Sequence, residues 1–198
     1  MWQAAFSQDT QGAMLYPKGN VWINGKQLPA ASAVLIGDTV ETEESSAANI
    51  SAPGSAAVVQ ESSVAKFGSN SVDLQRGTVN VTTTQKMNVH AGHVTATPIS
   101  ADATDFEVTD HDGRVNVAVH KGTVEVDCGK QVTDIQEGQD ITPDENGRCK
   151  AGAYPARSKG LLLNPWIWGG AAAAGGVIGI IIGVTGGGPA SPSAPGGP

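Results

Sequence analysis

Apolar and polar residues alternate in short runs along residues 13–149. A period of two residues is typical of half-buried β-strands, because successive side chains of a strand point to opposite faces. The pattern therefore predicts many short strands whose every second residue contributes to a core. The clearest predicted strands are residues 20–23, 78–81, 104–108, 114–119 and 123–126.

Three dipeptides between these runs favour tight hairpins. Asn24-Gly25, Asp112-Gly113 and Asn146-Gly147 supply residues that readily adopt the positive φ angles of such turns. No stretch of this region places apolar residues at i, i+3, i+4 and i+7 behind a cap, so we predict no long amphipathic helix in it. The predicted fold class is all-β, a compact domain of many short strands that is either a short β-solenoid or sandwich-like.

A weak internal repeat accompanies the strands. The pattern Gly-x-β-x-β, in which β is Val or Ile, begins at Gly19, Gly77, Gly113 and Gly122. Its spacing is irregular, so it does not predict a regular solenoid repeat. Residues 43–65 are rich in Ser and Ala; we predict strands of small residues there, with a disordered loop as the alternative.

Shifts in composition divide the chain into five predicted parts. After Cys149 the alternation stops and a basic stretch with Gly and Pro follows. The parts are an N-terminal segment (1–12), the β domain (13–149), a linker (150–160), an apolar Gly/Ala-rich helix (161–184) and a tail expected to be disordered (185–198).

The segment 161–184 is predicted to be a transmembrane helix. Its 24 residues carry no charge. A helix of this length can cross a hydrocarbon core of about 30 Å. Trp166 and Trp168 stand at its start, where indole rings favour the membrane interface. The alternative is a Gly/Ala-rich apolar tail used in assembly or left flexible, since six of the nineteen residues 166–184 are Gly.

Small residues recur every four positions along this segment. Ala171, Gly175, Gly179 and Gly183 would form one ridge of a helix, against which another helix can approach closely. We therefore expect the segment to permit self-association.

Two signals conflict over which side of the membrane the β domain occupies. Basic residues precede the apolar segment and none follows it, so the positive-inside tendency would keep the β domain in the cytoplasm. Cys128 and Cys149 could instead be neighbours across one antiparallel pairing and form a disulfide, which would place the domain outside the cytoplasm; buried free thiols are the alternative. Residues 1–6 lack the features of a signal peptide, so the chain is either unexported or shown without a removed leader.

Charge and composition narrow the function classes. The 19 acidic residues outnumber the 12 basic ones, giving a net charge of −7 and no electrostatic footprint for nucleic acid. Only 16% of the residues are charged, whereas 26 are Gly and 11 are Pro. This composition is poor for an ordinary enzyme core.

Candidate chemical sites are weak, and we predict no catalytic residue, no metal site and no cofactor. His90 and His93 lack a third ligand, and Asp110 with Asp112 fits a hairpin tip better than a calcium loop. The carboxylates most able to form an acid/base pair stand among polar neighbours, so we expect solvated charges there; they are Asp102, Asp105, Glu107, Asp134, Glu137 and Asp140.

Two further sets of residues have a structural and a functional interpretation. Trp22, Phe67 and Phe106 could form a binding platform, but we expect all three to fill the core, on the same side as their Val and Ile neighbours. Asn49 and Asn80 begin formal glycosylation sequons that lie in predicted strands, and these prove nothing about the host.

The ordered run of motifs resembles the FecR-like domain, an extracytoplasmic β domain named after a regulator of iron-dicitrate transport. The order of the motifs carries the resemblance, which extends over about residues 14–142. The matching segments are residues 19–25, 35–42, 63–67, 72–79, 94–98, 104–108, 117–126 and 135–139.

The resemblance implies a compact, mostly β domain that binds a partner outside the cytoplasm. Signalling members of the family place a helical anti-sigma region and a membrane helix before the β domain, whereas here the apolar segment follows it. We therefore expect a non-enzymatic, membrane-anchored binding or scaffolding module of the cell envelope, whose partner is a protein or an envelope polymer. The alternatives are a regulator that signals through its membrane helix and an enzyme acting on envelope polysaccharide, for which loss of turnover in Asp105→Asn would be the minimum evidence.

Overall fold

The computed structural model describes residues 12–144 and 147–153, which form seventeen β-strands. Their bounds are β1 (Gly12–Lys18), β2 (Val21–Ile23), β3 (Lys26–Gln27), β4 (Ser32–Leu35), β5 (Thr39–Thr42), β6 (Ala47–Ala52), β7 (Ser55–Val59), β8 (Val64–Phe67), β9 (Ser71–Thr83), β10 (Asn88–Ala91), β11 (Val94–Pro98), β12 (Thr104–His111), β13 (Arg114–Lys121), β14 (Thr123–Asp127), β15 (Val132–Gln136), β16 (Gln139–Pro143) and β17 (Cys149–Ala153). The prediction of an all-β domain of many short strands is confirmed.

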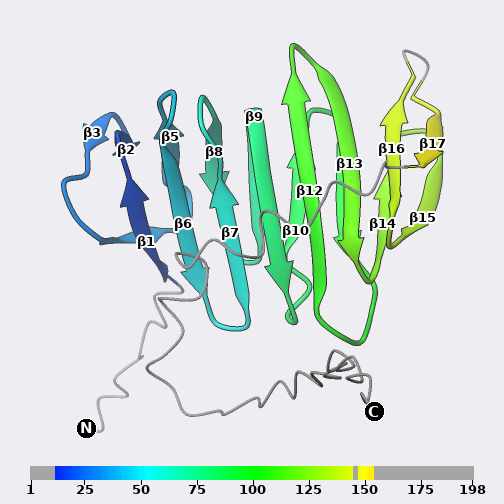
Figure 1. Cartoon of the computed structure of the whole chain (residues 1–198), viewed down its shortest axis with the longest axis horizontal. Coiled ribbons are helices and arrows are strands. Elements are labelled where there is room, and N and C mark those ends of the chain that lie inside the picture. Colours follow the sequence, from blue (N-terminus) through cyan, green and yellow to red (C-terminus); the bar gives the residue numbers. More distant parts are fainter. Residues whose placement is uncertain (1–11, 145–146, 154–198) are drawn as a thin grey trace, which may run out of the picture.

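The strands form one continuous sheet folded into two layers that share β9 (Figure 1). The first layer has the order β4-β1-β6-β7-β9-β12-β13-β16-β17 and is antiparallel throughout. The second layer has the order β3-β2-β5-β8-β9-β10-β11-β14-β15, in which only β9 and β10 are parallel. Of the two predicted architectures, this one is sandwich-like.

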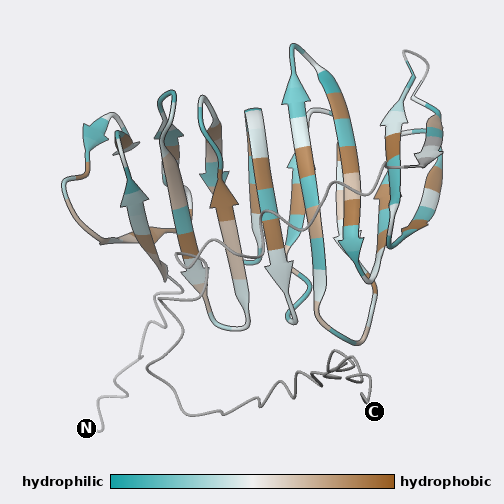
Figure 2. Ribbon diagram, in the orientation of Figure 1, coloured by the Kyte–Doolittle hydropathy of each residue, from teal (hydrophilic) through white to brown (hydrophobic). Residues whose placement is uncertain are grey.

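Alternating side chains from both layers fill one core between them. Bands of hydrophobic and hydrophilic residues alternate along several strands, most clearly β12 and β13 (Figure 2), and nearly all the buried positions are hydrophobic. On β9, for example, Val79 and Val81 are fully buried, whereas the side chain of Thr82 points to the opposite face and is exposed to solvent. The predicted strands of small residues within 43–65 are confirmed as β6, β7 and the start of β8.

Two of the three aromatic residues that we predicted to lie in the core are buried there. Phe67 and Phe106 are buried, as expected. The expectation for Trp22 is wrong, because Val21 points into the core and alternation turns the next side chain to the other face, where Trp22 is half-buried.

Two of the predicted hairpin turns have the expected backbone. Asn24 and Gly25 have φ angles of 50° and 75°, and Asp112 and Gly113 have 53° and 79°. At the second turn the Asp110 carboxylate accepts a hydrogen bond of 2.9 Å from the Gly113 N–H, as predicted for a hairpin tip. Asn146 of the third turn lies outside the described residues.

The chain crosses between the layers where a glycine packs against a serine. Within β9, residues 71–76 belong to the second layer and 77–83 to the first, and Gly77 has a φ of 92° at the junction. The next N–H, of Thr78, donates a hydrogen bond of 2.9 Å to Ser63 Oγ. The same bond recurs at two other crossings, from the Asn20 N–H to Ser46 Oγ and from the Thr123 N–H to Ser100 Oγ.

A disulfide joins Cys128 to Cys149, with 5.7 Å between their Cα atoms. The predicted pairing is confirmed, but the two residues are not opposite each other in one antiparallel ladder. Cys128 follows β14 of the second layer, whereas Cys149 begins β17, the edge strand of the first layer. The bond therefore ties the two layers together at one end of the sandwich.

The last strand extends beyond the predicted domain boundary. β17 continues to Ala153 because Ile141 and Asp140 of β16 pair with Ala151 and Gly152. The predicted interface residues Trp166 and Trp168, and the ridge of small residues, lie outside the described residues. In the part of the chain that is described, no helix is long and apolar enough to cross a membrane.

Substitution of Gly77 by Ala should destabilise the fold more than the same change at Gly37. Both glycines have similar φ angles, 92° and 95°, so both variants carry the same backbone strain of about 1–2 kcal/mol. A Cβ at Gly77 would also lie 2.6 Å from Ser63 Cα, whereas a Cβ at Gly37 meets nothing within 4 Å. Chemical denaturation should show a further loss of about 1–3 kcal/mol for Gly77→Ala; equal losses would contradict this account of the crossing.

Replacement of both cysteines by Ser should lower the free energy of unfolding by about 3 kcal/mol, because the disulfide closes a loop with a sequence separation of 21. The wild-type protein measured in reductant should match the double variant, and reductant should not change the variant further. Unchanged unfolding in both samples would show that the bond does not constrain the unfolded chain.

Candidate functional site

The outer face of the first layer is lined by polar side chains in register across several strands. Thr78 and Asn80 of β9 lie opposite Thr109 and Glu107 of β12. One complete row runs through Tyr16, Asn49, Val58, Asn80, Glu107, Ala118, Asp140 and Gly152. This row brings together polar residues that are far apart in the sequence.

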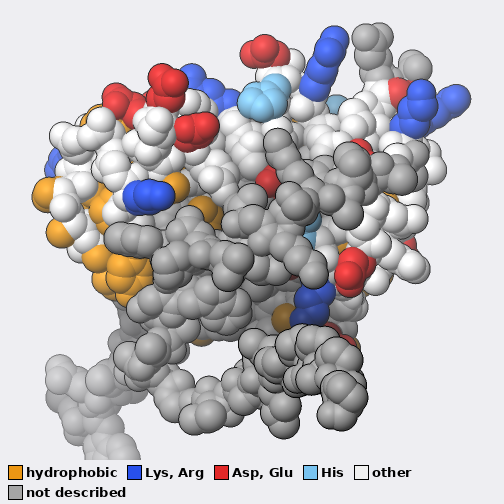
Figure 3. All heavy atoms as spheres, in the orientation of Figure 1, with side chains coloured by type: hydrophobic (Ala, Val, Ile, Leu, Met, Phe, Trp, Pro, Cys, Tyr) orange, Lys and Arg blue, Asp and Glu red, His pale blue; other side chains and the backbone are white. Residues whose placement is uncertain are grey.

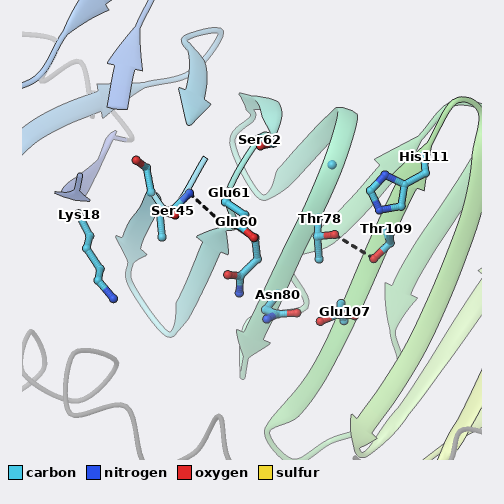
Figure 4. Close-up of a pocket in the computed structure, with 13 residues that line it drawn as sticks. Lys18, Ser45, Gln60, Glu61, Ser62, Thr78, Asn80, Glu107, Thr109 and His111 are labelled. Carbon is cyan, nitrogen blue, oxygen red and sulfur yellow. Dashed lines mark hydrogen bonds between the residues drawn. The ribbon is translucent and has the colours of Figure 1, made fainter. Parts of the chain in front are cut away.

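A groove of about 720 Å³ lies over this face (Figure 4). We call it the polar groove, because no aromatic or large aliphatic side chain lines it. Its lining residues are Lys18, Ser45, Ser46, Ala47, Gln60, Glu61, Ser62, Gly77, Thr78, Asn80, Glu107, Thr109 and His111. The groove thus offers hydrogen-bonding groups of both kinds, with two carboxylates and one lysine.

Two similar turns build one wall of the polar groove. Each contains the sequence Glu-Ser-Ser, at residues 44–46 and 61–63, and its first serine has a positive φ, 58° at Ser45 and 55° at Ser62. The turns are linked, because the Ser45 N–H donates a hydrogen bond of 2.7 Å to Glu61 Oε2. The second serine of each turn is the one that accepts the hydrogen bond at a layer crossing.

Most functional groups in the groove are not engaged with other residues of the described chain. Thr78 and Thr109 form a hydroxyl pair with 3.1 Å between their oxygen atoms. Lys18, Gln60 and Glu107 make no side-chain hydrogen bond or ion pair within the described residues. These groups are therefore available to a ligand.

Two asparagine oxygens on this face are shielded from solvent and have no hydrogen-bond partner. They are Oδ1 of Asn80, in the groove, and Oδ1 of Asn49, on the same row. A buried acceptor without a donor is unfavourable by about 1–3 kcal/mol. Both side chains are only half-buried, so a turn of either amide would bring its oxygen to the surface, where it could accept a hydrogen bond.

The histidines and cysteines singled out from the sequence lie elsewhere. His90 Nδ1 is 3.0 Å from Thr95 Oγ1 of the neighbouring strand, and the pair His90 and His93 is not joined by a third ligand. Within the described ranges, no group of three or more His, Cys, Asp or Glu side chains could hold a metal ion.

Asp105 differs from the solvated carboxylate that we expected. It is partly buried, and this desolvation raises its pKa above the ordinary value, although the charges of His120 and Lys121 act in the opposite direction. A β-bulge brings His120 and Lys121 close to Asp105. Asp105 pairs with Lys121 and Phe106 pairs with Val119, so His120 is the extra residue of the bulge. Asp105 does not line the polar groove.

A second, apolar surface lies at the edge of the first layer that is formed by β4 and its neighbour β1. Hydrophobic side chains gather at the end of the molecule that holds β1 to β4 (Figure 3). Met14, Leu35 and Ile36 are 41%, 44% and 52% exposed there. The edge of β4 is partly closed, since the Leu35 N–H donates a hydrogen bond of 2.8 Å to Asp38 Oδ2.

The residues of the polar groove were not predicted as a site, although Glu107 was named as a solvated carboxylate. A signal was present, because Thr78, Asn80 and Thr82 alternate with buried valines, as do Glu107, Thr109 and His111 with other residues of β12. Such alternation identifies an outer face but not its neighbours. Asn49 and Asn80 were noticed only because they begin sequons.

Comparison with known proteins supports the fold. No family model and no curated protein matches this sequence. Two crystal structures of a candidate anti-sigma factor from Parabacteroides distasonis match with a TM-score of 0.50 and 15% sequence identity, and the match covers 59% of this chain and 59% of that one. The matched region therefore spans less than two thirds of that protein. At this identity the likeness establishes the all-β fold alone; it fits the resemblance to FecR-like domains, which stays a prediction.

Replacement of Asp105 by Asn should stabilise the protein at neutral pH. A raised pKa means that the folded state binds the proton more tightly than the unfolded chain, so wild-type stability falls as the pH rises above the ordinary value of 3.8. The Asn variant cannot ionise and avoids this loss. Thermal melts from pH 3 to pH 8 should show a higher Tm for the variant at pH 7 and convergence at pH 3; a lower Tm at pH 7 would contradict the burial effect.

Proposed function

We propose that this protein is a non-enzymatic binding module of the cell envelope, whose β domain lies outside the cytoplasm and is held at the membrane by residues 161–184. The disulfide between Cys128 and Cys149 is the observation that carries this proposal. Structural disulfides persist in oxidising compartments and are rare in the cytoplasm. We give this disulfide more weight than the basic residues that precede the apolar segment, because those residues favour a cytoplasmic β domain.

The polar groove supports binding as the activity of the module. Its side chains are held on a rigid sheet, and several have no partner within the described residues. Binding sites built on regular strands position their groups more accurately than sites built on loops. The partner is a protein or an envelope polymer, and self-association through the ridge of Ala171, Gly175, Gly179 and Gly183 remains part of the proposal.

A signalling role is the second candidate. The observation that favours a signalling role is the similarity of this β fold to that of a candidate anti-sigma factor. A regulator would need to transmit binding through its membrane segment. If removal of residues 161–198 leaves transcription unchanged, and transcription is equally indifferent to the full chain, the signalling role is excluded.

Thiol labelling in whole cells should show that both cysteines are oxidised. Free thiols are blocked in denatured, acid-quenched cells before reduction and labelled with a heavier reagent after it, and mass spectrometry then reports each cysteine. We expect Cys128 and Cys149 to carry only the heavier reagent. The control is Cys128→Ser, in which Cys149 has no partner in this chain and should take the first reagent.

The opposite labelling result would reverse the orientation. If both wild-type cysteines react before reduction, the β domain faces the cytoplasm and the positive-inside tendency is correct. The search for a partner would then move inside the cell.

A further inference from the structure

We propose that the polar groove binds a glycan that carries acetamido groups, with Asn80, Thr78 and Thr109 as its principal hydrogen-bonding contacts. This inference rests on the proposed function as a binding module and names the class of its ligand.

The unpaired atoms define what the ligand must supply. Asn80 Oδ1 is an acceptor without a donor and is shielded from solvent; the side chain is only half-buried, so a ligand meets this oxygen when the amide turns toward the groove. The adjacent pair of Thr78 and Thr109 hydroxyls can both donate and accept. An acetamido group matches this set, because its N–H can donate to Asn80 while its carbonyl accepts from a threonine or from the amide of Gln60.

The charge of the groove favours a ligand without charge. Glu61 and Glu107 are balanced in part by Lys18, and no cluster of basic side chains is present among the lining residues. An anionic polymer would find a single lysine beside two carboxylates. Sugar hydroxyls, by contrast, can donate to carboxylate and amide oxygens without any change in net charge.

A protein partner fits this groove less well than a sugar chain. Protein interfaces depend on a few buried anchors, mainly Trp, Tyr and Arg, placed in desolvated pockets. None of these residues lines the groove. The exposed apolar surface of Met14, Leu35 and Ile36 lies at a different edge and is the part of the described chain better suited to a protein contact.

The row of residues in register also suits an extended ligand. Asn49 repeats the unpaired oxygen of Asn80, and Val58 lies between them in the same row. Tyr16, the register partner of Asn49, provides an aromatic ring at one end of this row. Sugar rings pack on aromatic faces through their C–H groups, so a chain of several sugars can cross the strands from Tyr16 toward Glu107.

Titration calorimetry of the full chain in detergent micelles tests the proposal. The probe is the hexamer of N-acetylglucosamine, and cellohexaose serves as the comparison because it has the same linkage without acetamido groups. We expect the first sugar to bind and the second to bind more weakly. Asn80→Leu and Thr78→Val should each weaken binding of the first sugar about tenfold, the effect of one lost hydrogen bond.

Thr82→Val is the matched control. Thr82 lies on the same strand and the same face as Thr78 and Asn80, but it does not line the groove. We expect this variant to bind the sugar as the wild-type chain does. If it loses affinity to the same extent, the effect of Thr78→Val reflects the strand rather than the groove, and the proposed contact is wrong.

Thermal stability separates a ligand contact from a structural role. Without sugar, Asn80→Leu should melt at the same temperature as wild type or higher, because an apolar side chain of similar shape removes an unpaired acceptor. A lower Tm with unchanged affinity would make Asn80 a structural residue. Failure of the wild-type chain to bind the hexamer overturns the glycan proposal, whereas the labelling result for Cys128 and Cys149 would still decide whether the domain lies outside the cytoplasm.

Discussion

The two-layered fold depends on a small hydrogen bond that is made where the chain passes from one layer to the other. At each of three crossings a backbone N–H donates to a serine hydroxyl, and the clearest case joins Thr78 to Ser63. The bond matters because a crossing strand leaves the ladder of one layer before it enters the other, so its partly buried N–H would otherwise lack an acceptor. A serine is small enough to reach that N–H. The residue before the donating N–H is a glycine, which has no side chain and so leaves the space that the serine occupies.

The same requirement shapes the polar groove. Two of the three serines, Ser46 and Ser63, belong to the Glu-Ser-Ser turns at residues 44–46 and 61–63. These turns are also a wall of the groove. The crossing at Gly77 places residues 77–83 of β9 in the first layer, where β12 pairs with them. The floor and the wall of the groove are therefore fixed by the contacts that hold the layers together, and a ligand would meet a surface that is organised before binding.

The sequence predicted the local features well and the long-range ones poorly. Alternation located the strands, and Asn24-Gly25 and Asp112-Gly113 located two turns, because each depends on neighbours within a few residues. The pairing of Asn80 with Glu107 depends on the register between β9 and β12, which no local pattern determines. Asp105 was misjudged for a similar reason, since its burial and its two cationic neighbours follow from a bulge in the pairing with β13. The cysteines were paired correctly, yet the layers that they join became clear only from the topology.

The position of the disulfide matters for the last strand that the structure describes. Among the described strands, β17 pairs with β16 alone, and an edge strand held on one side opens more easily than a central strand. Cys149 is the first residue of that strand, and Cys128 continues the buried face of β14 in the other layer. If β17 separates from β16, the covalent bond still holds its first residue to the second layer. The two layers are therefore held together at this end even where the edge strand frays, and the core beneath the polar groove stays closed.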